Sequence, residues 1–152
     1  MYTDDIRVIK QTKGRLLGVD FGDTRTGLAL SDPSRYLASG IGTVSPGSMT
    51  KTADAVALAA KEHAVGAIIV GLPVNMNGTQ GQRAEHIRAF VDMLDERVGE
   101  LPVFLMDERM TTMAASRFLN ETNTRGTKRK QVIDTLSAQI ILQNALDRLK
   151  NL

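Results

Sequence analysis

The stretch that decides the fold is Arg15-Leu-Leu-Gly-Val-Asp20-Phe-Gly-Asp-Thr-Arg-Thr-Gly27-Leu-Ala-Leu30, two short apolar segments joined by a tight polar link. The glycine and polar residues at 22–25 are typical of a hairpin turn, so residues 15–21 and 26–31 are predicted to form antiparallel strands. The carboxylate of Asp20 falls at the end of the first strand, where desolvation costs free energy unless a cation or several donors compensate it. We therefore interpret Asp20 as a metal-binding carboxylate, with a plain turn or cap residue as the alternative.

Length and composition are those of a single-domain protein without disulfides. The 152 residues match one compact domain, and cysteine is absent, which excludes disulfides and thiolate metal sites. No apolar run has membrane-spanning length, and residues 1–7 lack the basic and then apolar order of a signal peptide, so we expect a cytoplasmic protein with no membrane partner. The net charge of +2 and the sequence pI of about 9.1 allow an acidic, phosphate-rich partner without requiring one.

The remainder of the chain alternates predicted strands and helices. Residues 1–13 have no sustained periodicity and are expected to form a flexible N-terminal arm, followed by a single domain at 14–152. Predicted strands follow at 36–45, 66–71 and 102–106, and predicted helices at 49–63, 79–98, about 111–119 and 128–149. Three opening strands followed by alternating helices and strands indicate an α/β fold, a mixed sheet with helices on both faces.

Two further acids, Glu108 and Asp134, lie in segments that this topology would bring close to Asp20. Glu108 lies just past the last predicted strand, and functional residues of such sheets collect outside the carboxyl ends of parallel strands. Asp134 shares one face of the last helix with Ala138 and Ile141, so its side chain is expected to point toward the body of the protein. A carboxylate on an apolar helix face needs a partner, and divalent ions shared with the other two acids would supply one.

Each acid also has an ordinary interpretation. Asp134 could cap its helix or pair with Lys130, and neighbouring strand residues point to opposite sides, so only one of Asp107 and Glu108 can face the site. Three carboxylates without His or Cys form a hard oxygen site that suits Mg²⁺ or Mn²⁺. Two such ions can hydrolyse a phosphodiester without a nucleophilic Ser, Cys or His.

A basic cluster precedes and opens the last predicted helix. Its members are Arg125, Lys128, Arg129 and Lys130. Cations at a helix N-terminus oppose the macrodipole, so this placement costs some stability and is explained by an incoming phosphate backbone. A solvated helix end is the alternative interpretation. Arg109, beside Glu108, is either a second phosphate contact or the partner of an acid.

Five motifs within residues 14–149 resemble the YqgF family, small bacterial proteins of the ribonuclease H-like, Holliday-junction-resolvase-like superfamily. They are Leu17-Gly-Val-Asp20-Phe-Gly22, Arg25-Thr-Gly27, Val70-Gly-Leu-Pro73, Asp107-Glu-Arg-Met-Thr-Thr112 and Asp134-Thr-Leu-Ser-Ala-Gln-Ile-Ile-Leu-Gln143. The resemblance implies a ribonuclease H-like fold, with a five-stranded mixed sheet in the order 3-2-1-4-5, strand 2 antiparallel and helices on both faces.

The same resemblance implies a metal-dependent nuclease whose acidic triad is Asp20, Glu108 and Asp134, with Mg²⁺ or Mn²⁺ as cofactor. The family is assigned to maturation of the 5′ end of pre-16S ribosomal RNA in the cytoplasm, and was earlier proposed to resolve Holliday junctions. On this basis Arg25 joins Arg109 and the basic cluster as an expected nucleic-acid contact.

Three functions stay open at this point. The leading hypothesis is a Mg²⁺-dependent endonuclease acting on structured RNA, mainly pre-rRNA. The second makes branched DNA the substrate, and symmetric cutting of two strands would then call for a homodimer rather than a monomer. The third is a nucleic-acid-binding factor without catalysis. The pattern Asp20-x-Gly22-x-Thr24 also resembles the phosphate loop of actin-like ATPases, but those proteins enclose a nucleotide between two domains and this chain has length for one.

Overall fold

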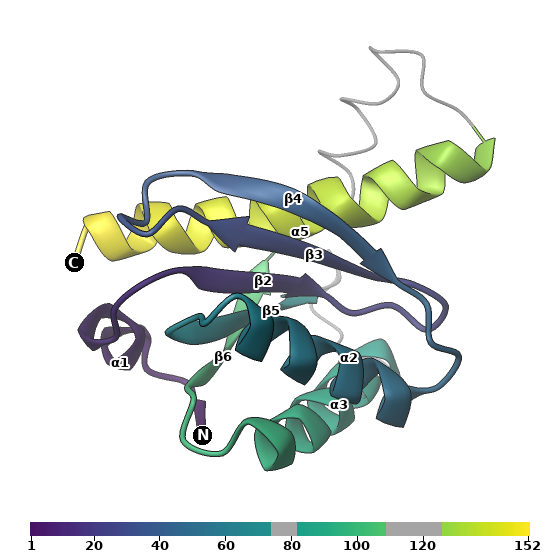
Figure 1. The fold of residues 1–152 in the computed structure, drawn as a ribbon, viewed down its shortest axis with the longest axis horizontal. Helices are drawn as coiled ribbons and strands as arrows, with labels where there is room; N and C mark the ends of the chain where they lie inside the picture. Colours follow the sequence, from purple (N-terminus) through teal and green to yellow (C-terminus); the bar gives the residue numbers. More distant parts are fainter. Residues whose placement is uncertain (74–81, 109–125) are drawn as a thin grey trace.

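A six-stranded sheet with a long helix across one face forms the core of the structure (Figure 1). The computed structural model describes residues 1–73, 82–108 and 126–152. The strands are β1 (Tyr2–Thr3), β2 (Leu16–Asp20), β3 (Thr26–Ser31), β4 (Ala38–Val44), β5 (Ala67–Pro73) and β6 (Val103–Glu108). The helices are α1 (Ile6–Gln11), α2 (Met49–Glu62), α3 (Gln82–Val98) and α5 (Gly126–Lys150).

The strand order is β1-β6-β5-β2-β3-β4, with a parallel half and an antiparallel half. β2 pairs parallel with β5 and antiparallel with β3, where Asp20 lies opposite Gly27, so the predicted hairpin is confirmed. Read from β4 to β6, the five strands have the order 3-2-1-4-5 that the resemblance implied. The expected count of five strands is wrong by one, because Tyr2 and Thr3 extend the parallel ladder beyond β6.

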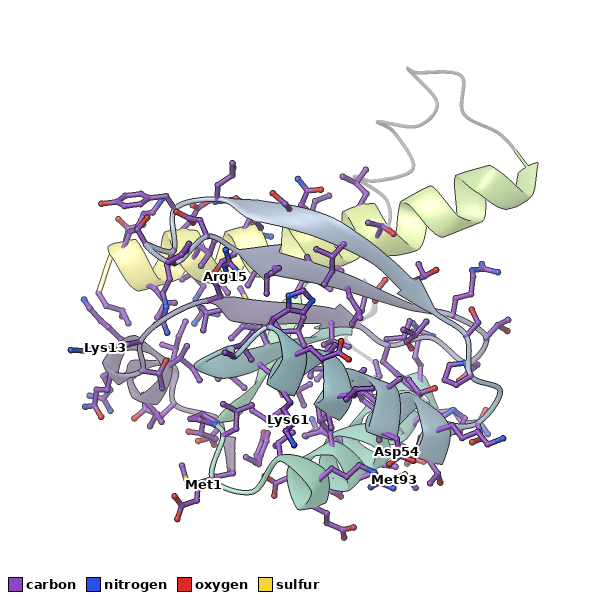
Figure 2. All side chains as sticks on the ribbon, in the orientation of Figure 1. Met1, Lys13, Arg15, Asp54, Lys61 and Met93 are labelled. Atoms are coloured by element: carbon purple, nitrogen blue, oxygen red, sulfur yellow. The ribbon has the colours of Figure 1, made fainter. Side chains whose placement is uncertain are left out.

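The N-terminal segment forms β1 and α1 and contacts the rest of the chain, where the sequence pattern predicts a flexible arm. The ammonium group of Met1, which is labelled in Figure 2, pairs with Asp95 of α3 at 2.8 Å, and Ile9 of α1 is fully buried. Arg35 donates hydrogen bonds to the Ile9 carbonyl at 3.1 Å and to the Thr12 hydroxyl at 2.8 Å. The segment is therefore held by the burial of Ile9 and by the pairing of β1 with the edge strand β6. Its apolar pattern is too short for periodicity to predict these elements.

Alternate residues of β2 point to opposite faces of the sheet and join two separate cores. Leu16 packs in the core under α5, and Leu17 packs in the core under α2 and α3. Figure 1 shows α5 lying across one face while α2 and α3 cover the other, so the prediction of helices on both faces is confirmed.

Most predicted elements lie close to the observed ones. Each predicted strand from residue 15 onward agrees with the observed bounds within two residues, as do the helices at 49–63 and 128–149. The helix predicted at about 111–119 lies outside the described residues, as does the start of the helix predicted at 79–98. None of the described helices combines the length and apolar character needed to cross a membrane.

Candidate active site

Asp20 ends the central strand of the sheet at an edge that two other strands share. β2, β5 and β6 run parallel, and they end at Asp20, Pro73 and Glu108. The Asp20 side chain is half-buried, so it is accessible to a ligand but partly shielded from water. The carboxyl edge of a mostly parallel sheet is where such folds bind ligands.

Phe21, the residue after Asp20, contacts helix α3 through both its ring and its backbone carbonyl. The ring of Phe21 stacks on that of Phe90 of α3, with centroids 4.4 Å apart and an interplanar angle of 17°. The carbonyl of Phe21 accepts a hydrogen bond from the Arg83 Nη2 at 2.9 Å. Both contacts fix the end of β2, and through it the backbone of the acid.

Helix α5 runs antiparallel to β2 and brings its N-terminal part toward the carboxyl end of that strand. Thr135 lies against Gly40, whereas Gln143 accepts a hydrogen bond from the Ala38 backbone N–H at 2.9 Å. Helix α5 therefore runs antiparallel to β4. Strand β4 is parallel to β2, because each of them pairs antiparallel with β3. Asp134, one residue before Thr135, consequently lies toward the same edge of the sheet as the end of β2.

Three glycines on the α5 face of the sheet let the helix contact the strands directly. They are Gly18 of β2, Gly40 of β4 and Gly71 of β5, and a Cβ on any of them would meet an atom of α5. At Gly71 this atom belongs to the Ile141 side chain. Close approach at three strands fixes the height and rotation of the helix above the sheet.

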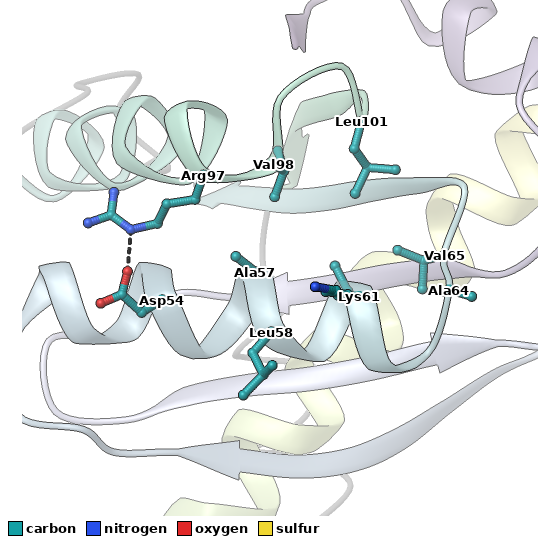
Figure 3. Close-up of a pocket in the computed structure, with 10 residues that line it drawn as sticks. Asp54, Ala57, Leu58, Lys61, Ala64, Val65, Arg97, Val98 and Leu101 are labelled. Carbon is teal, nitrogen blue, oxygen red and sulfur yellow. Dashed lines mark hydrogen bonds and ion pairs between the residues drawn. The ribbon is translucent and has the colours of Figure 1, made fainter.

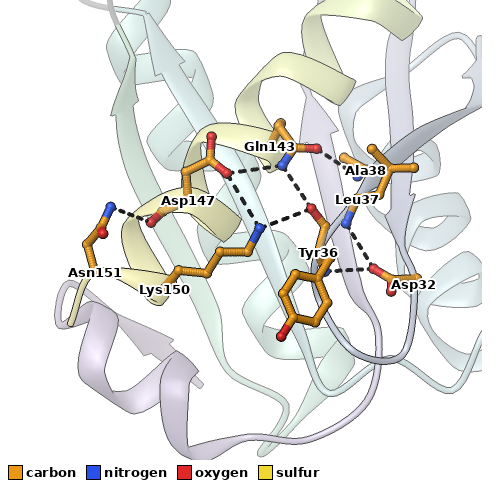
Figure 4. Close-up of polar contacts among 8 residues, drawn as sticks. All are labelled: Asp32, Tyr36, Leu37, Ala38, Gln143, Asp147, Lys150 and Asn151. Carbon is orange, nitrogen blue, oxygen red and sulfur yellow. Dashed lines mark hydrogen bonds and ion pairs between the residues drawn. The ribbon is translucent and has the colours of Figure 1, made fainter.

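A polar network anchors the other half of α5 to the β3–β4 loop (Figure 4). The Gln143 side chain donates to the Tyr36 carbonyl at 3.1 Å, and Lys150 lies 4.7 Å from the centroid of the Tyr36 ring. In the same loop, the Ser34 hydroxyl and the backbone N–H of Leu37 donate to Asp32 and lower the pKa of its carboxyl to about 2. These contacts hold the loop against the helix, at the end of the sheet opposite Asp20.

The structure describes the backbone but not the side chains at the other two acids. Glu108 is the last residue of β6, in register with Pro73, and Asp134 lies in α5. The neighbouring acid Asp107 has an exposed side chain. The backbone positions of the three predicted acids therefore converge on one edge of the sheet, two at strand ends and one on the helix that crosses them.

The predicted nucleic-acid contacts are described unevenly. Arg25 lies in the link between β2 and β3 and is half-buried, and its carbonyl oxygen lies against Gly22 in a tight turn. Lys128, Arg129 and Lys130 belong to the first turns of α5, where the side chains are not described. Arg109 and Arg125 lie outside the described residues.

Two further polar side chains, Arg83 and Ser137, lie near this edge. Arg83 binds the backbone after Asp20, across 62 residues of chain, and nothing in its local sequence marks that contact. Ser137 of α5 is 1% exposed, and within the described part of the chain its hydroxyl has no hydrogen-bond partner. Ser137 is a polar residue on an otherwise apolar helix face, three residues after Asp134.

A groove of about 560 Å³ lies between α2 and α3, on the face of the sheet opposite α5 (Figure 3). Ala57, Leu58 and Val98 contribute to its apolar walls, and an ion pair between Asp54 and Arg97 lies at one end. Among the residues whose side chains the structure describes, no predicted site residue lines it. The groove is therefore separate from the candidate active site.

The donor set of the candidate site fits a hard divalent cation. Carboxylate and hydroxyl oxygens are the ligands that Mg²⁺ and Mn²⁺ prefer. Among the residues whose side chains are described, no group of three or more His, Asp or Glu side chains could hold a metal ion, so Asp20 would need Glu108 and Asp134 to complete a site. The buried, unpartnered hydroxyl of Ser137 is consistent with an oxygen-rich ligand at this edge.

A comparison with protein families identifies the chain. The family described as "RuvX: Holliday junction resolvase" matches residues 14–148. The chain belongs to the RuvX family. The resemblance to this family, also called YqgF, is therefore confirmed, and membership makes the chain a nuclease.

Curated relatives align with about nine-tenths of the chain. A protein of Thermoanaerobacter pseudethanolicus named "Putative pre-16S rRNA nuclease" is 44% identical over 138 residues, which is 90% of this chain and 99% of the relative. A protein of Ruminiclostridium cellulolyticum with the same name is 39% identical over 136 residues, 89% of this chain and 95% of the relative.

Solved structures agree with the fold. The Thermus thermophilus RuvC structure has a TM-score of 0.54 at 13% identity, covering 90% of this chain and 96% of that one. The same protein in complex with a Holliday junction substrate has a TM-score of 0.53 at 14% identity, covering 91% and 96%. At such low identity the likeness supports the α/β, ribonuclease H-like architecture alone.

Proposed function

We propose that this RuvX protein is a Mg²⁺- or Mn²⁺-dependent endonuclease that cleaves structured RNA, with the 5′ region of precursor 16S rRNA in the cytoplasm as its substrate. One observation carries the proposal: Asp20, Glu108 and Asp134 occupy backbone positions at one edge of the sheet. The relatives named as pre-16S rRNA nucleases support the choice of RNA.

The position of Glu108 in β6 supports its choice over Asp107. Phe104 and Met106 of β6 pack in the core under α5. Alternate residues of a strand share one face of the sheet, so position 108 lies on the same face as these two residues. Asp107 falls in the opposite phase and its side chain is exposed.

The proposed mechanism needs no nucleophilic side chain. When bound, two Mg²⁺ or Mn²⁺ ions would activate a water molecule and stabilise the leaving oxygen of the phosphodiester. The carboxylates of Asp20, Glu108 and Asp134 would hold the ions. The packing of Phe21 and the hydrogen bond from Arg83 would keep the Asp20 backbone fixed during this chemistry.

Cations around the acids would bind the phosphate backbone. Arg25 follows Asp20 in the link to β3, and Lys128, Arg129 and Lys130 open the helix that carries Asp134. Arg109 and Arg125 complete the proposed set. Contacts to phosphates are independent of sequence, so they would position the substrate without selecting it.

Branched DNA is the second candidate substrate. The description of the family as Holliday junction resolvases favours it. Symmetric resolution of a junction would call for two active sites, so this candidate includes a homodimer, whereas RNA cleavage is compatible with a monomer.

A cleavage assay tests the proposal. Precursor 16S rRNA and a four-way DNA junction are incubated with the protein, with Mg²⁺ and with EDTA. We expect Mg²⁺-dependent cutting of the RNA, abolished in Asp20→Asn and retained in Asp23→Asn, whose acid is exposed in the same link. Cutting of the junction alone would replace RNA by DNA as substrate. Undiminished cleavage by Asp20→Asn would exclude the mechanism.

A further inference from the structure

One buried hydroxyl in α5 differs from the other buried polar groups. The described buried polar side chains are those of Thr26, Ser31, Thr52 and Ser137. Three of them have partners. The Thr52 hydroxyl donates to the Ser48 carbonyl at 2.8 Å, the Ser31 hydroxyl accepts from the Leu16 N–H at 2.8 Å, and the Thr26 hydroxyl accepts from the Gly22 N–H at 3.4 Å.

Ser137 is the exception. It is 1% exposed, and its Oγ has no hydrogen-bond partner in the described part of the chain. A buried hydroxyl without a partner is unfavourable, because it has left water without replacing the hydrogen bonds made there. Packing alone does not require it, since Ala138 and Ala145 occupy the same buried helix face as small apolar residues. The hydroxyl therefore calls for an explanation other than size.

The helix geometry directs Ser137 toward the candidate active site. Ile141, one turn later on the same side of α5, lies against Gly71 of β5, whereas Thr135 lies over β4 on the other side. Because α5 runs antiparallel to β2, Ser137 lies closer to the carboxyl edge than Ile141 does. It is thus on the β5 side of the helix, three residues after Asp134, near the level where β2 ends.

We propose that the Ser137 hydroxyl hydrogen-bonds an oxygen ligand of the divalent cation and so positions the ligand set. This inference rests on the proposed function and adds a fourth, uncharged member to the site. Ser137 is a positioning residue, since it would act through a ligand rather than on the substrate. Partners of this kind hold metal ligands in one orientation, and their loss weakens metal binding by about 10- to 100-fold.

The test measures Mn²⁺ binding to the whole protein without nucleic acid, by titration calorimetry. We expect Ser137→Ala to bind Mn²⁺ about 10-fold more weakly than the unchanged protein. Its melting temperature in EDTA should be unchanged or raised, because an unpartnered buried hydroxyl is removed. Cleavage should need more Mg²⁺ for half-maximal rate, with a smaller change in the rate at saturating Mg²⁺.

Ser31→Ala is the matched control, because Ser31 is a buried serine whose hydroxyl is paired at the other end of the sheet. It should lower the melting temperature and leave Mn²⁺ binding unchanged. Ser137→Cys provides a second variant, since it keeps a similar volume but supplies only a weak donor. It should weaken Mn²⁺ binding as Ser137→Ala does.

Asp20→Asn separates a failure of this inference from a failure of the proposed function. If Asp20→Asn loses Mn²⁺ binding while Ser137→Ala and Ser137→Cys bind Mn²⁺ as tightly as the unchanged protein, only the role of Ser137 is overturned. If Asp20→Asn itself binds Mn²⁺ normally, the proposed metal site is wrong, and the role of Ser137 is overturned with it.

Discussion

The carbonyl oxygen of Ala138 lies 3.1 Å from the point that a Cβ on Gly18 would occupy, so helix α5 rests on the backbone of β2. The Cβ of Leu142 is closer still, at 2.7 Å. Gly18 lies two residues before Asp20, and Ala138 lies four residues after Asp134. This close packing therefore sets the distance between the strand and the helix that carry two of the proposed metal ligands.

Gly18→Ala should force α5 away from the sheet. Overpacking of a filled core costs about 1–3 kcal/mol, and the neighbours here are a backbone carbonyl and a Cβ, which cannot rotate away. We expect a lower free energy of unfolding in urea and a loss of cleavage activity. Gly71→Ala is the comparison, because its added methyl would meet the movable tip of Ile141, and it should cost less. Equal losses in the two variants would contradict this explanation.

The sequence predicts the sheet well because each strand is a short apolar run bounded by turn residues. Leu16 and Leu17 are both apolar, however, and only the structure assigns them to different cores. The role of Gly18 is equally invisible in the pattern, since a glycine in a strand indicates a close approach without naming what approaches.

The candidate site is predicted where local chemistry marks it. Asp20 stands out as a charge at the end of an apolar strand. Arg83 does not, because its bond to the Phe21 carbonyl depends on how α3 packs against β2. Ser137 is visible as a polar residue on an apolar face, but the lack of a described partner for its hydroxyl is a property of the folded chain.

Ile9→Ala tests whether the N-terminal segment belongs to the folded core. Ile9 is fully buried, and replacing a buried isoleucine by alanine costs about 2–5 kcal/mol. Thermal and urea unfolding should both show this loss. Ile41→Ala is the control, because that side chain is 41% exposed and its truncation should change stability by no more than about 0.5 kcal/mol. Wild-type stability in Ile9→Ala would mean that the segment is a loose arm after all.

Asp32 should make the protein lose stability in acid. Hydrogen bonds, led by the one from the Ser34 hydroxyl and followed by that from the Leu37 backbone N–H, lower its pKa from 3.8 to about 2 in the folded state. A carboxyl group whose pKa is lower in the folded than in the unfolded protein stabilises the fold at pH values above its unfolded pKa. For Asp32 that contribution disappears as the pH falls from 3.8 toward 2. Melting temperatures measured from pH 5 to pH 2 should therefore fall less steeply in Asp32→Asn than in the unchanged protein. Parallel curves would show that Asp32 contributes nothing to acid unfolding.

Glu108→Gln should remove cleavage, whereas Asp107→Asn should not. The amide keeps the shape of Glu108 but not its negative charge, and loss of one charge-stabilising group typically lowers the rate by about 100-fold or more. Asp107 lies in the opposite phase of β6 with an exposed side chain, so its loss should leave the rate within about twofold, a surface effect. Rates on precursor 16S rRNA at saturating Mg²⁺ decide the matter. The reverse result would exchange the two acids in the proposed site.

The basic cluster at the start of α5 should be visible in the salt dependence of RNA binding. Removing one cation that binds a phosphate reduces the slope of log K against log salt by about 0.7 for single strands and 0.9 for duplex. Lys128→Gln combined with Lys130→Gln should therefore weaken binding and flatten this slope by about 1.4 to 1.8. Lys13→Gln with Lys61→Gln removes the same charge, but Lys13 lies just before β2 and Lys61 lies in the last turn of α2, which leads into β5 (Figure 2). Both double variants change the net charge equally. A slope that changes only in Lys128→Gln with Lys130→Gln would locate the RNA beside Asp134. Equal changes of slope in the two double variants would indicate a diffuse electrostatic effect instead.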